Sequence, residues 1–446
     1  MLQRSKFGAL AAVAVATAMS LSGCMKDKCT RTVTYTDYRP VYMTYDQIRQ
    51  PIAAQAPRTI EQAGKIYLYD RYLLLGEVGD GIHVFDISGA TASPVAFLPI
   101  VGNKDMAIRN NILYADNYTD LVAIDISDIQ RPVTVGRTEN VFINFFSGGM
   151  DDGSGQGMLV DYEPYEVTAE LDCQEAQWRT NGGWGGNGGG FIGGPTVMED
   201  RAMGAPTNMM GGGGSAESGG GRGSSTGIGG SMARFTIVGS HLYTVDEMGM
   251  RIFDISDASN AQLANTVDIG WGIETIFPAN GSLFIGSNTG MFIYSLTDPT
   301  NPTLLSEFQH AEACDPVFVS GNHAYVTLRT GTMCANGSNE LNVLDVTDLT
   351  NPVLLATYPM HNPHGLSVLN ETLYLCEGDG GLKGFDVTDK LTIDQHEHFH
   401  FTGFDAYDVI ASPYQPVLLV TGADGLRLYD NTQAHNPTLV STIAVQ

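Results

Sequence analysis

Three histidines alternate along one short segment of the chain, DQHEHFHF, and their spacing allows metal binding. Side chains at every second position of a β-strand share one face, so His396, His398 and His400 would stand together on a strand. Three imidazoles on one face could hold Zn²⁺ or Cu²⁺. The alternative is an exposed outer strand, where polar side chains protect the edge against aggregation.

A second group of polar residues is dispersed along the sequence, beside apolar runs and turns. The group comprises Asp105, Glu274, Asp315, Arg329, His364, Glu377 and Asp408. If these side chains converge in a concavity, they form a ligand-binding site, and their carboxylates could hold Ca²⁺ or Zn²⁺. Whether they converge depends on the elements that position them.

An internal repeat identifies those elements. The phrase FDVTD and its variants occur seven times, with Asp86, Asp125, Asp254, Ser295, Asp345, Asp386 and Asp430 at the equivalent position. Most copies are roughly 40–50 residues apart, and each holds four apolar runs separated by turns such as GDG, which favour antiparallel hairpins. One four-stranded sheet cannot bury both of its faces, whereas seven sheets arranged radially can. The sequence therefore predicts an all-β fold, a seven-bladed β-propeller of four-stranded antiparallel blades.

The propeller gives the dispersed polar residues a common location. Its innermost strands line a central channel, and the turns between second and third strands open on the face where the innermost strands begin. We expect the dispersed group to gather at that channel mouth as a ligand-binding site. The alternative is that its aspartates accept hydrogen bonds from backbone amides near the channel. For the repeated aspartate we expect a structural role, because short Asp and Ser side chains bond backbone amides in turns.

The N-terminal residues 1–24 carry a targeting signal. A basic start with Arg4 and Lys6 precedes a short apolar run, and Leu21-Ser22-Gly23-Cys24 follows. The pattern resembles a bacterial lipoprotein signal peptide, and the resemblance implies acylation of Cys24. Because two or more acyl chains anchor a protein stably, we expect membrane attachment through the N-terminal lipid. Met25 after the cysteine favours the outer membrane, with the protein facing either the periplasm or the cell surface.

The remaining cysteines lie in a compartment where disulfides form. Five follow Cys24, so at least one is unpaired. We expect Cys314 and Cys334 to pair, because both belong to one repeat; the partners of Cys29, Cys173 and Cys376 stay open.

The rest of the chain divides by composition. Residues 25–60 form a tether and lead-in segment, 61–146 form blades 1 and 2, and 231–446 form blades 3–7. Residues 147–230 interrupt the repeat with tracts such as NGGWGGNGGG. Such a composition buries too little apolar surface to offset the entropy of ordering, so we expect a flexible insertion.

Several motifs resemble one family of propellers. LVAIDISD (121–128), SGNHAYV (320–326) and NPVLLA (351–356) resemble the LVIVD-repeat proteins, which include envelope lipoproteins of Bacteroidetes type. The resemblance covers about residues 31–146 and 231–446. It implies the propeller fold and an envelope location, and it implies no established activity.

Composition and motifs limit the possible functions. A net charge of −26 argues against nucleic-acid binding, which relies on Lys and Arg at phosphates. The sequence has no CxxC motif. Its GxSxG string, GSSTG (223–227), lies in the glycine-rich insertion, and its HExxH string, HEHFH (396–400), lies on the expected outer strand, so neither has the strand-to-helix turn or the helix that the catalytic motif needs. We predict a lipid-anchored scaffold that binds an envelope protein or a small ligand, with no cofactor. The alternative is a metal-dependent, lactonase-like hydrolase that uses the carboxylates of the channel mouth.

Overall fold

The computed structural model describes residues 29–89, 91–142, 157–180, 226–246, 248–309, 316–330 and 339–445. The chain divides into two compact units, of which one comprises residues 1–41 and 161–195 and the other comprises residues 42–160 and 196–446. Each unit is described by itself.

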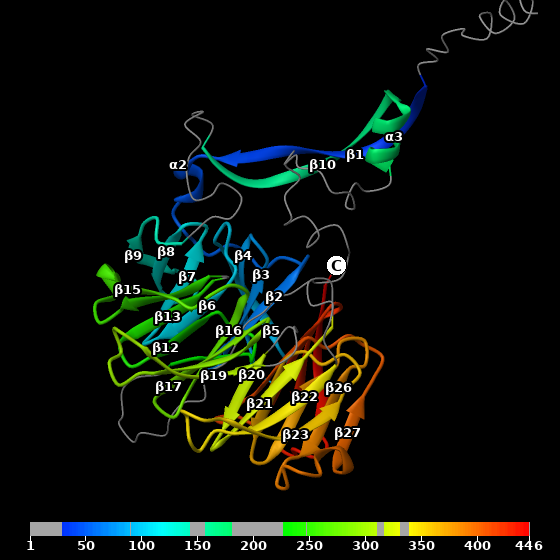
Figure 1. The fold of residues 1–446 in the computed structure, drawn as a ribbon. Coiled ribbons are helices and arrows are strands. Elements are labelled where there is room, and N and C mark those ends of the chain that lie inside the picture. The colour runs from blue at the N-terminus through cyan, green and yellow to red at the C-terminus, as the bar shows by residue number, and fades with distance from the viewer. Residues whose placement is uncertain are drawn as a thin grey trace, which may run out of the picture. The chain divides into compact units, whose positions relative to one another are not determined.

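The larger unit is a seven-bladed β-propeller (Figure 1). The strands of its blades are β2 (Ala63–Tyr69), β3 (Tyr72–Glu77), β4 (Gly81–Asp86) and β5 (Ser93–Pro99); β6 (Met106–Arg109), β7 (Ile112–Asn117), β8 (Asp120–Asp125) and β9 (Val133–Thr138); β12 (Phe235–Val238), β13 (His241–Val245), β14 (Gly249–Asp254) and β15 (Gln262–Asp268); β16 (Ile273–Ala279), β17 (Ser282–Ser287), β18 (Gly290–Ser295) and β19 (Thr303–Gln309); β20 (Val317–Ser320), β21 (His323–Leu328), β22 (Glu340–Asp345) and β23 (Val353–Pro359); β24 (Leu366–Leu369), β25 (Thr372–Cys376), β26 (Leu382–Asp386) and β27 (Glu397–Phe401); β28 (Asp408–Ala411), β29 (Val417–Gly422), β30 (Gly425–Asp430) and β31 (Thr438–Ala444). Short helices α2 (Tyr45–Ile48), η1 (Ala258–Asn260) and η2 (Ile393–Gln395) occur in the connections. The predicted fold class and blade composition are confirmed.

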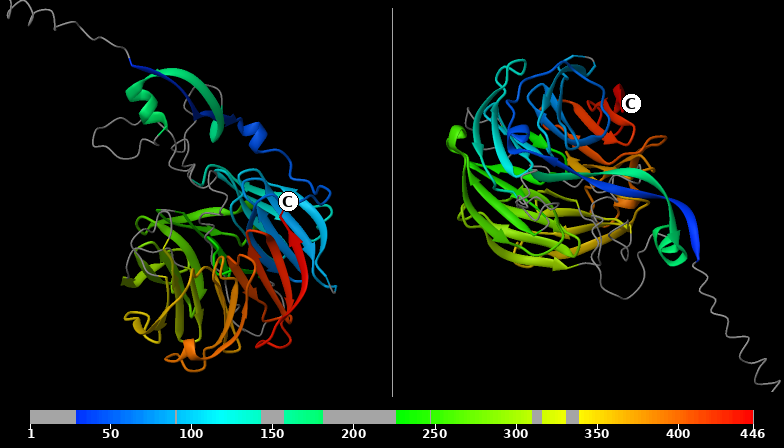
Figure 2. Two further views of the ribbon diagram at one scale, coloured as in Figure 1. Left: turned by 90° about the vertical axis from the view of Figure 1, so that its right-hand side faces the viewer. Right: turned by 90° about the horizontal axis from the view of Figure 1, so that it is seen from above.

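The first strand of every blade lies innermost. Neighbouring first strands contact one another around the ring, from β2 and β6 through β12, β16, β20 and β24 to β28 and back to β2. Figure 2 shows the result, with the C-terminal blade beside the N-terminal one. Apolar side chains of adjacent blades fill the space between the sheets; for example, Ile60 and Ile66 of the first blade pack with Leu419 and Leu426 of the last. The seven sheets thus bury faces that one sheet alone could not bury.

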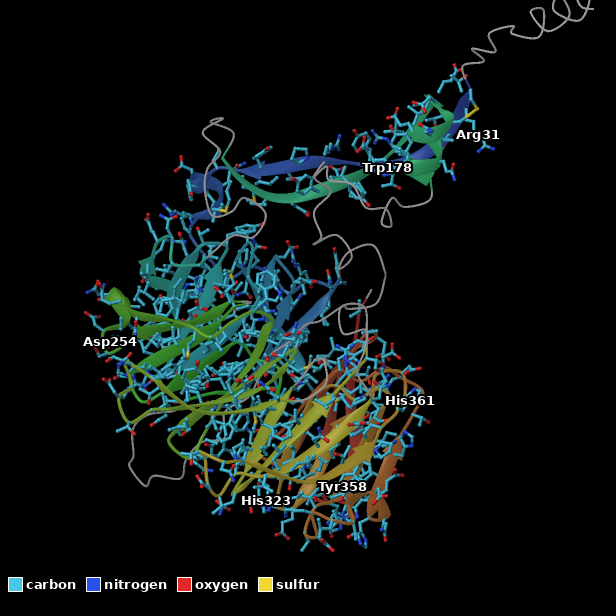
Figure 3. The ribbon with its side chains drawn as sticks, in the orientation of Figure 1. Arg31, Trp178, Asp254, His323, Tyr358 and His361 are labelled. Carbon is cyan, nitrogen blue, oxygen red and sulfur yellow. A yellow bond between two sulfur atoms is a disulfide. The ribbon has the colours of Figure 1, made fainter. Side chains whose placement is uncertain are left out.

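The repeated aspartate serves the turn after the third strand, as the sequence predicted. In six blades its carboxylate accepts a hydrogen bond from the backbone amide two residues later, at 2.7–2.9 Å. In the fourth blade, the Ser295 hydroxyl accepts the corresponding bond from Thr297 at 3.2 Å. Asp254, labelled in Figure 3, lies on the periphery of the propeller and shows that this position is remote from the channel.

The central channel is occupied by residues 226–234, here named the channel segment. Its strand β11 (Ile228–Gly229) pairs antiparallel with the inner edge of β2. Thr226 pairs with Arg109 at the end of β6, whereas Arg234 lies beside Asp105, immediately before β6 begins. The segment therefore runs through the ring from the C-terminal ends of the inner strands to their N-terminal ends, and it leads directly into β12.

Small residues allow the channel segment to fit. A Cβ atom added to Gly227 would lie 2.2 Å from the Tyr67 ring, and one added to Gly230 would lie 1.8 Å from the Asp408 carboxylate. Ser231 and Met232 are 1 % and 5 % exposed. Steric exclusion thus explains why glycine occupies positions 227 and 230 of the channel segment.

The glycine-rich region also differs from the expected flexible insertion in a second place. Strand β10 (Met158–Asp172) pairs with β1 (Thr30–Met43), and helix α3 (Cys173–Thr180) follows it (Figure 1). The smaller unit is closed by a disulfide between Cys29 and Cys173. The alternating composition of 158–172 is strand-like, and the disulfide lowers the entropy of the unfolded chain by closing a long loop. Residues 157–180 and 226–230 are thus ordered parts of the expected insertion.

Of the other cysteines, only Cys376 lies among the described residues. Cys376 is buried with a free thiol. Cys314 and Cys334, predicted to pair, lie outside the described residues, as does Cys24. In the portion of the chain that the structure describes, no helix has the length and apolar character needed to span a membrane.

The channel segment yields a stability prediction. Replacing Gly230 with alanine places a methyl group against Asp408, so we expect a loss of about 1–3 kcal/mol in the free energy of unfolding. The matched control is Gly89→Ala, where the nearest atom to the new Cβ is 3.8 Å away. Denaturant unfolding of both variants measures the difference. Equal stabilities would show that the channel segment does not pack against Asp408 as described.

Candidate ligand-binding site

Two of the predicted carboxylates hold the channel segment. Asp105 accepts hydrogen bonds from the amides of Met106 at 2.7 Å, Phe235 at 3.1 Å and Arg234. Asp408 accepts bonds from the Ser231 amide at 3.1 Å and the Ser231 hydroxyl at 3.2 Å, and also from the amide of Val409. Both carboxylates thus accept hydrogen bonds from backbone amides, which is the structural role that the sequence analysis gave as the alternative to ligand binding.

Glu377 has a comparable structural role outside the candidate site. Its carboxylate accepts bonds from the His361 amide at 3.1 Å and from Lys383 Nζ at 3.2 Å, and it is fully buried. Glu77 occupies the equivalent turn of blade 1 and accepts a bond from the Glu61 amide. These glutamates hold the chain that enters the inner strand of their own blade.

A recess lies where the inner strands begin, and blades 1, 5, 6 and 7 contribute to it. The residues that line this recess are Ala63, Gly64, Lys65, Met232, Arg329, His364, Tyr407, Asp408, Thr421 and Gly422. Met232 belongs to the channel segment, so the segment that fills the channel also forms part of the recess wall. The recess gathers three of the predicted residues, namely Arg329, His364 and Asp408.

His364 contributes a buried imidazole to the lining of the recess. Its backbone is fixed, because its amide donates to the Cys376 carbonyl at 2.8 Å and its carbonyl accepts from Thr327 Oγ1 at 2.7 Å. The side chain is 6 % exposed, its ring centroid lies 5.0 Å from that of Tyr407, and Nε2 has no hydrogen-bond partner in the described parts of the protein. Burial and the charge of Arg329 hold the pKa of His364 well below its ordinary value, so the imidazole is neutral near pH 7.

Lys65 is a lining residue that the sequence reasoning missed. Its Nζ donates to the Met232 carbonyl at 3.0 Å and lies 3.7 Å from Asp105 Oδ2. Burial lowers the pKa of Lys65 to about 8, against the opposing charge of Asp105. The available signal was a lysine near the start of an otherwise apolar strand, GKIYLY.

Arg329 follows β21 and brings a half-buried guanidinium to the recess. Burial lowers the pKa of Arg329, while the charge of Glu274 raises it by less. Glu274 does not line the recess, but its negative charge favours the charged form of Arg329. Asp315 lies outside the described residues.

The three histidines of DQHEHFHF do not form a common site. His396 caps η2 and therefore precedes β27, which removes it from the expected alternation. The ring of His398 stacks on His435 at 3.7 Å, and His400 Nε2 lies 2.8 Å from the Gly380 carbonyl. Among the described residues, no group of three His, Cys, Asp or Glu side chains is placed to hold a metal ion.

Comparisons with known proteins identify the repeat. A model of the LVIVD repeat matches residues 103–139, 229–269 and 312–359, which correspond to blades 2, 3 and 5. The chain is therefore a seven-bladed β-propeller that contains LVIVD repeats. A search of curated proteins found no match.

Solved propellers resemble this chain at low identity. The computationally designed protein Ika8 is 10% identical, with a TM-score of 0.49 and coverage of 88% of this chain and 92% of Ika8. The periplasmic gluconolactonase PpgL of Pseudomonas aeruginosa is 12% identical, with a TM-score of 0.48 and coverage of 86% and 97%. BamB from Moraxella catarrhalis is 9% identical, with a TM-score of 0.44 and coverage of 90% and 98%. Likeness at this level carries no inference about activity.

The buried carboxyl of Asp408 predicts a pH dependence. Burial raises the pKa of Asp408 from 3.8 to about 7, so the folded protein binds this proton more tightly than the unfolded chain. The resulting stabilisation is complete below pH 3.8 and is lost as the pH rises through 7, at about 1.4 kcal/mol per pKa unit. We expect Asp408→Asn to gain stability relative to the natural chain as the pH rises from 4 to 8.

Unfolding of both proteins in denaturant at several pH values measures the difference in stability. Other buried groups, including Lys65 and Asp116, are present in both proteins and largely cancel. Parallel pH profiles would contradict the burial of an ionisable Asp408 carboxyl.

Proposed function

We propose that the protein is a lipid-anchored binding protein of the bacterial envelope, and that it binds a small ligand in the recess. The observation that carries this proposal is the recess itself, whose lining includes His364, a buried imidazole with an Nε2 atom that has no hydrogen-bond partner in the described parts of the chain. A buried polar atom without a partner costs about 1–3 kcal/mol, which a bound ligand could recover.

The channel segment supports binding in preference to passage through the ring. Its residues fill the channel and contribute Met232 to the wall of the recess. A ligand that enters at the mouth would therefore meet the channel segment instead of an open path. Asp105 and Asp408, which a channel-metal hydrolase would use as ligands, already accept backbone amides.

The envelope location rests on the N-terminal sequence. Cys24 follows a basic start and an apolar run, in the arrangement of a lipoprotein signal. The Cys29–Cys173 disulfide supports the same proposal, because structural disulfides are favoured in exported proteins.

The anchor is tested by Cys24→Ala in cells that process lipoproteins. We expect the variant to lose acylation and to leave the membrane fraction, since each buried methylene of an acyl chain contributes about 0.8 kcal/mol to membrane binding. Membrane fractionation of the natural chain and the variant measures the effect. Unchanged membrane association of an unacylated variant would refute the anchor.

Ligand binding is tested with His364→Ala. We expect a small-molecule extract of the envelope to raise the melting temperature of the natural chain and to leave that of His364→Ala unchanged, because the variant lacks the imidazole in the recess. The control is His323→Ala, at the start of β21 and outside the recess lining. Thermal unfolding with and without extract gives the shifts, and mass spectrometry identifies retained compounds. Equal shifts in all three proteins would refute binding at the recess.

A further inference from the structure

Helix α3 lies on one face of the two-stranded ribbon that β1 and β10 form in the smaller unit. Side chains alternate between the two faces of a strand, so Tyr35 and Asp37 share one face of β1. Arg179 of α3 reaches both, because its guanidinium lies 4.7 Å from the Tyr35 ring centroid and 3.8 Å from the Asp37 carboxylate. The helix therefore packs on this face, and Thr32 and Thr36 are exposed on the opposite face.

The two faces of the ribbon differ in charge. On the α3 side, Arg179 lies 3.5 Å from Glu175 and 3.8 Å from Asp37, so these charges offset one another. The opposite side carries exposed acids such as Glu170, whose carboxylate accepts a hydrogen bond from Thr30 at 2.6 Å. Because anionic headgroups repel an acidic face, the α3 side is the better suited of the two to contact a lipid surface.

The outward side of α3 carries an exposed tryptophan. Ala176 is the one buried apolar side chain among the described residues of the smaller unit, and it marks the side of α3 that packs on the ribbon. Trp178 follows two positions later, about 200° around the helix, and is 55 % exposed. Gln174, four positions before Trp178, shares this outward side, which is thus aromatic and uncharged. An indole in such surroundings suits a membrane interface, where tryptophan rings lie at the level of the headgroups.

The disulfide connects this helix to the expected lipid anchor. Cys29 follows Cys24 by five positions, which span at most about 18 Å of extended chain. Cys29 is bonded to Cys173, the first residue of α3, with the Cα atoms 5.4 Å apart, and α3 lies beside the N-terminal end of β1 (Figure 1). Trp178 lies about 7.5 Å further along the helix axis. A surface tethered this closely to a membrane needs little affinity of its own to bind there.

We propose that the Trp178 side of α3 lies in the headgroup region of the membrane that holds the Cys24 lipid. This inference rests on the proposed lipid anchor, and it assigns a lipid-contacting surface to the smaller unit. Phospholipid is the occupant because the short tether, the disulfide and the exposed indole all lie at one end of that unit. A second copy of the chain is an outcome that the test distinguishes.

Fluorescence quenching by brominated lipid tests the contact. The acylated mature chain, with Trp178 as its only tryptophan through Trp184→Phe and Trp271→Phe, is reconstituted in phosphatidylcholine vesicles with and without bromine on the acyl chains. We expect brominated lipid to lower the emission of Trp178 by about twofold, since the ring lies at the interface. The comparison chain keeps only Trp271, which lies outside the smaller unit and is 63 % exposed, and its emission should fall much less.

Paired charge variants give a matched control within the smaller unit. Gln174→Glu together with Gln177→Glu places two negative charges on the exposed side of α3, and we expect the quenching of Trp178 to be lost because charged groups resist transfer from water into the interface. Thr32→Glu together with Thr36→Glu adds the same charge to the opposite face of the ribbon and should leave the quenching unchanged. All four positions are exposed, so neither pair disturbs buried contacts.

The opposing outcomes are distinguishable. If the chain floats with the vesicles and Trp178 is not quenched, α3 faces away from the lipid, this inference is wrong and the anchor stands. If the chain is neither acylated nor bound to vesicles, the anchor is refuted and this inference with it. Equal quenching of Trp178 and Trp271 would show a membrane contact that the smaller unit does not direct. A blue-shifted, concentration-dependent emission of Trp178 in the unacylated chain without vesicles would assign this surface to a second copy instead.

Discussion

Hydrogen bonds from the channel segment to two buried carboxylates organise the centre of this propeller. Asp105 accepts the amides of Arg234 and Phe235, and Asp408 accepts the amide and hydroxyl of Ser231. The two aspartates belong to blades 2 and 7, so one short segment connects blades on either side of blade 1. A buried amide without a partner would be costly, and the carboxylates satisfy these amides where no neighbouring strand can.

The same segment sets the character of the recess. Its backbone keeps Asp408 in place, its Met232 side chain lines the wall, and its carbonyl holds Lys65. The charged groups of the recess are thus fixed by contacts that also stabilise the ring. His364 and Arg329 come from blades 6 and 5, and Nε2 of His364 has no hydrogen-bond partner among the described residues.

The repeat made the architecture predictable, because the period of alternating strands and the turn aspartates are local properties of the sequence. The channel segment was not predictable in this way, since Thr226–Arg234 is glycine-rich and the contacts that hold it in the channel, with β2, Asp105 and Asp408, are distant in sequence. The same limitation applies to Cys29 and Cys173, which a long stretch of chain separates. The positions of Arg329, His364 and Asp408 within their blades predicted that these residues would lie at one mouth of the channel, and all three line the recess. The same positions could not show whether a carboxylate faces a ligand or accepts a hydrogen bond from a backbone amide. For the histidines, a register shift in β27 breaks the expected alternation, because Gly384 pairs with Phe399 and Phe385 with Glu397, which leaves His398 outside the regular pairing.

Amide hydrogen exchange of residues 226–234 tests the central role of the channel segment most directly. The amides of Gly230, Ser231 and Arg234 donate to Ile66, Asp408 and Asp105, respectively, inside the ring. Their exchange should therefore be as slow as that of the inner strands β6 and β28, because all of them open only when the ring opens. Exchange of these three amides as fast as that of the exposed turn at Gly89, with β6 and β28 still protected, would contradict the account.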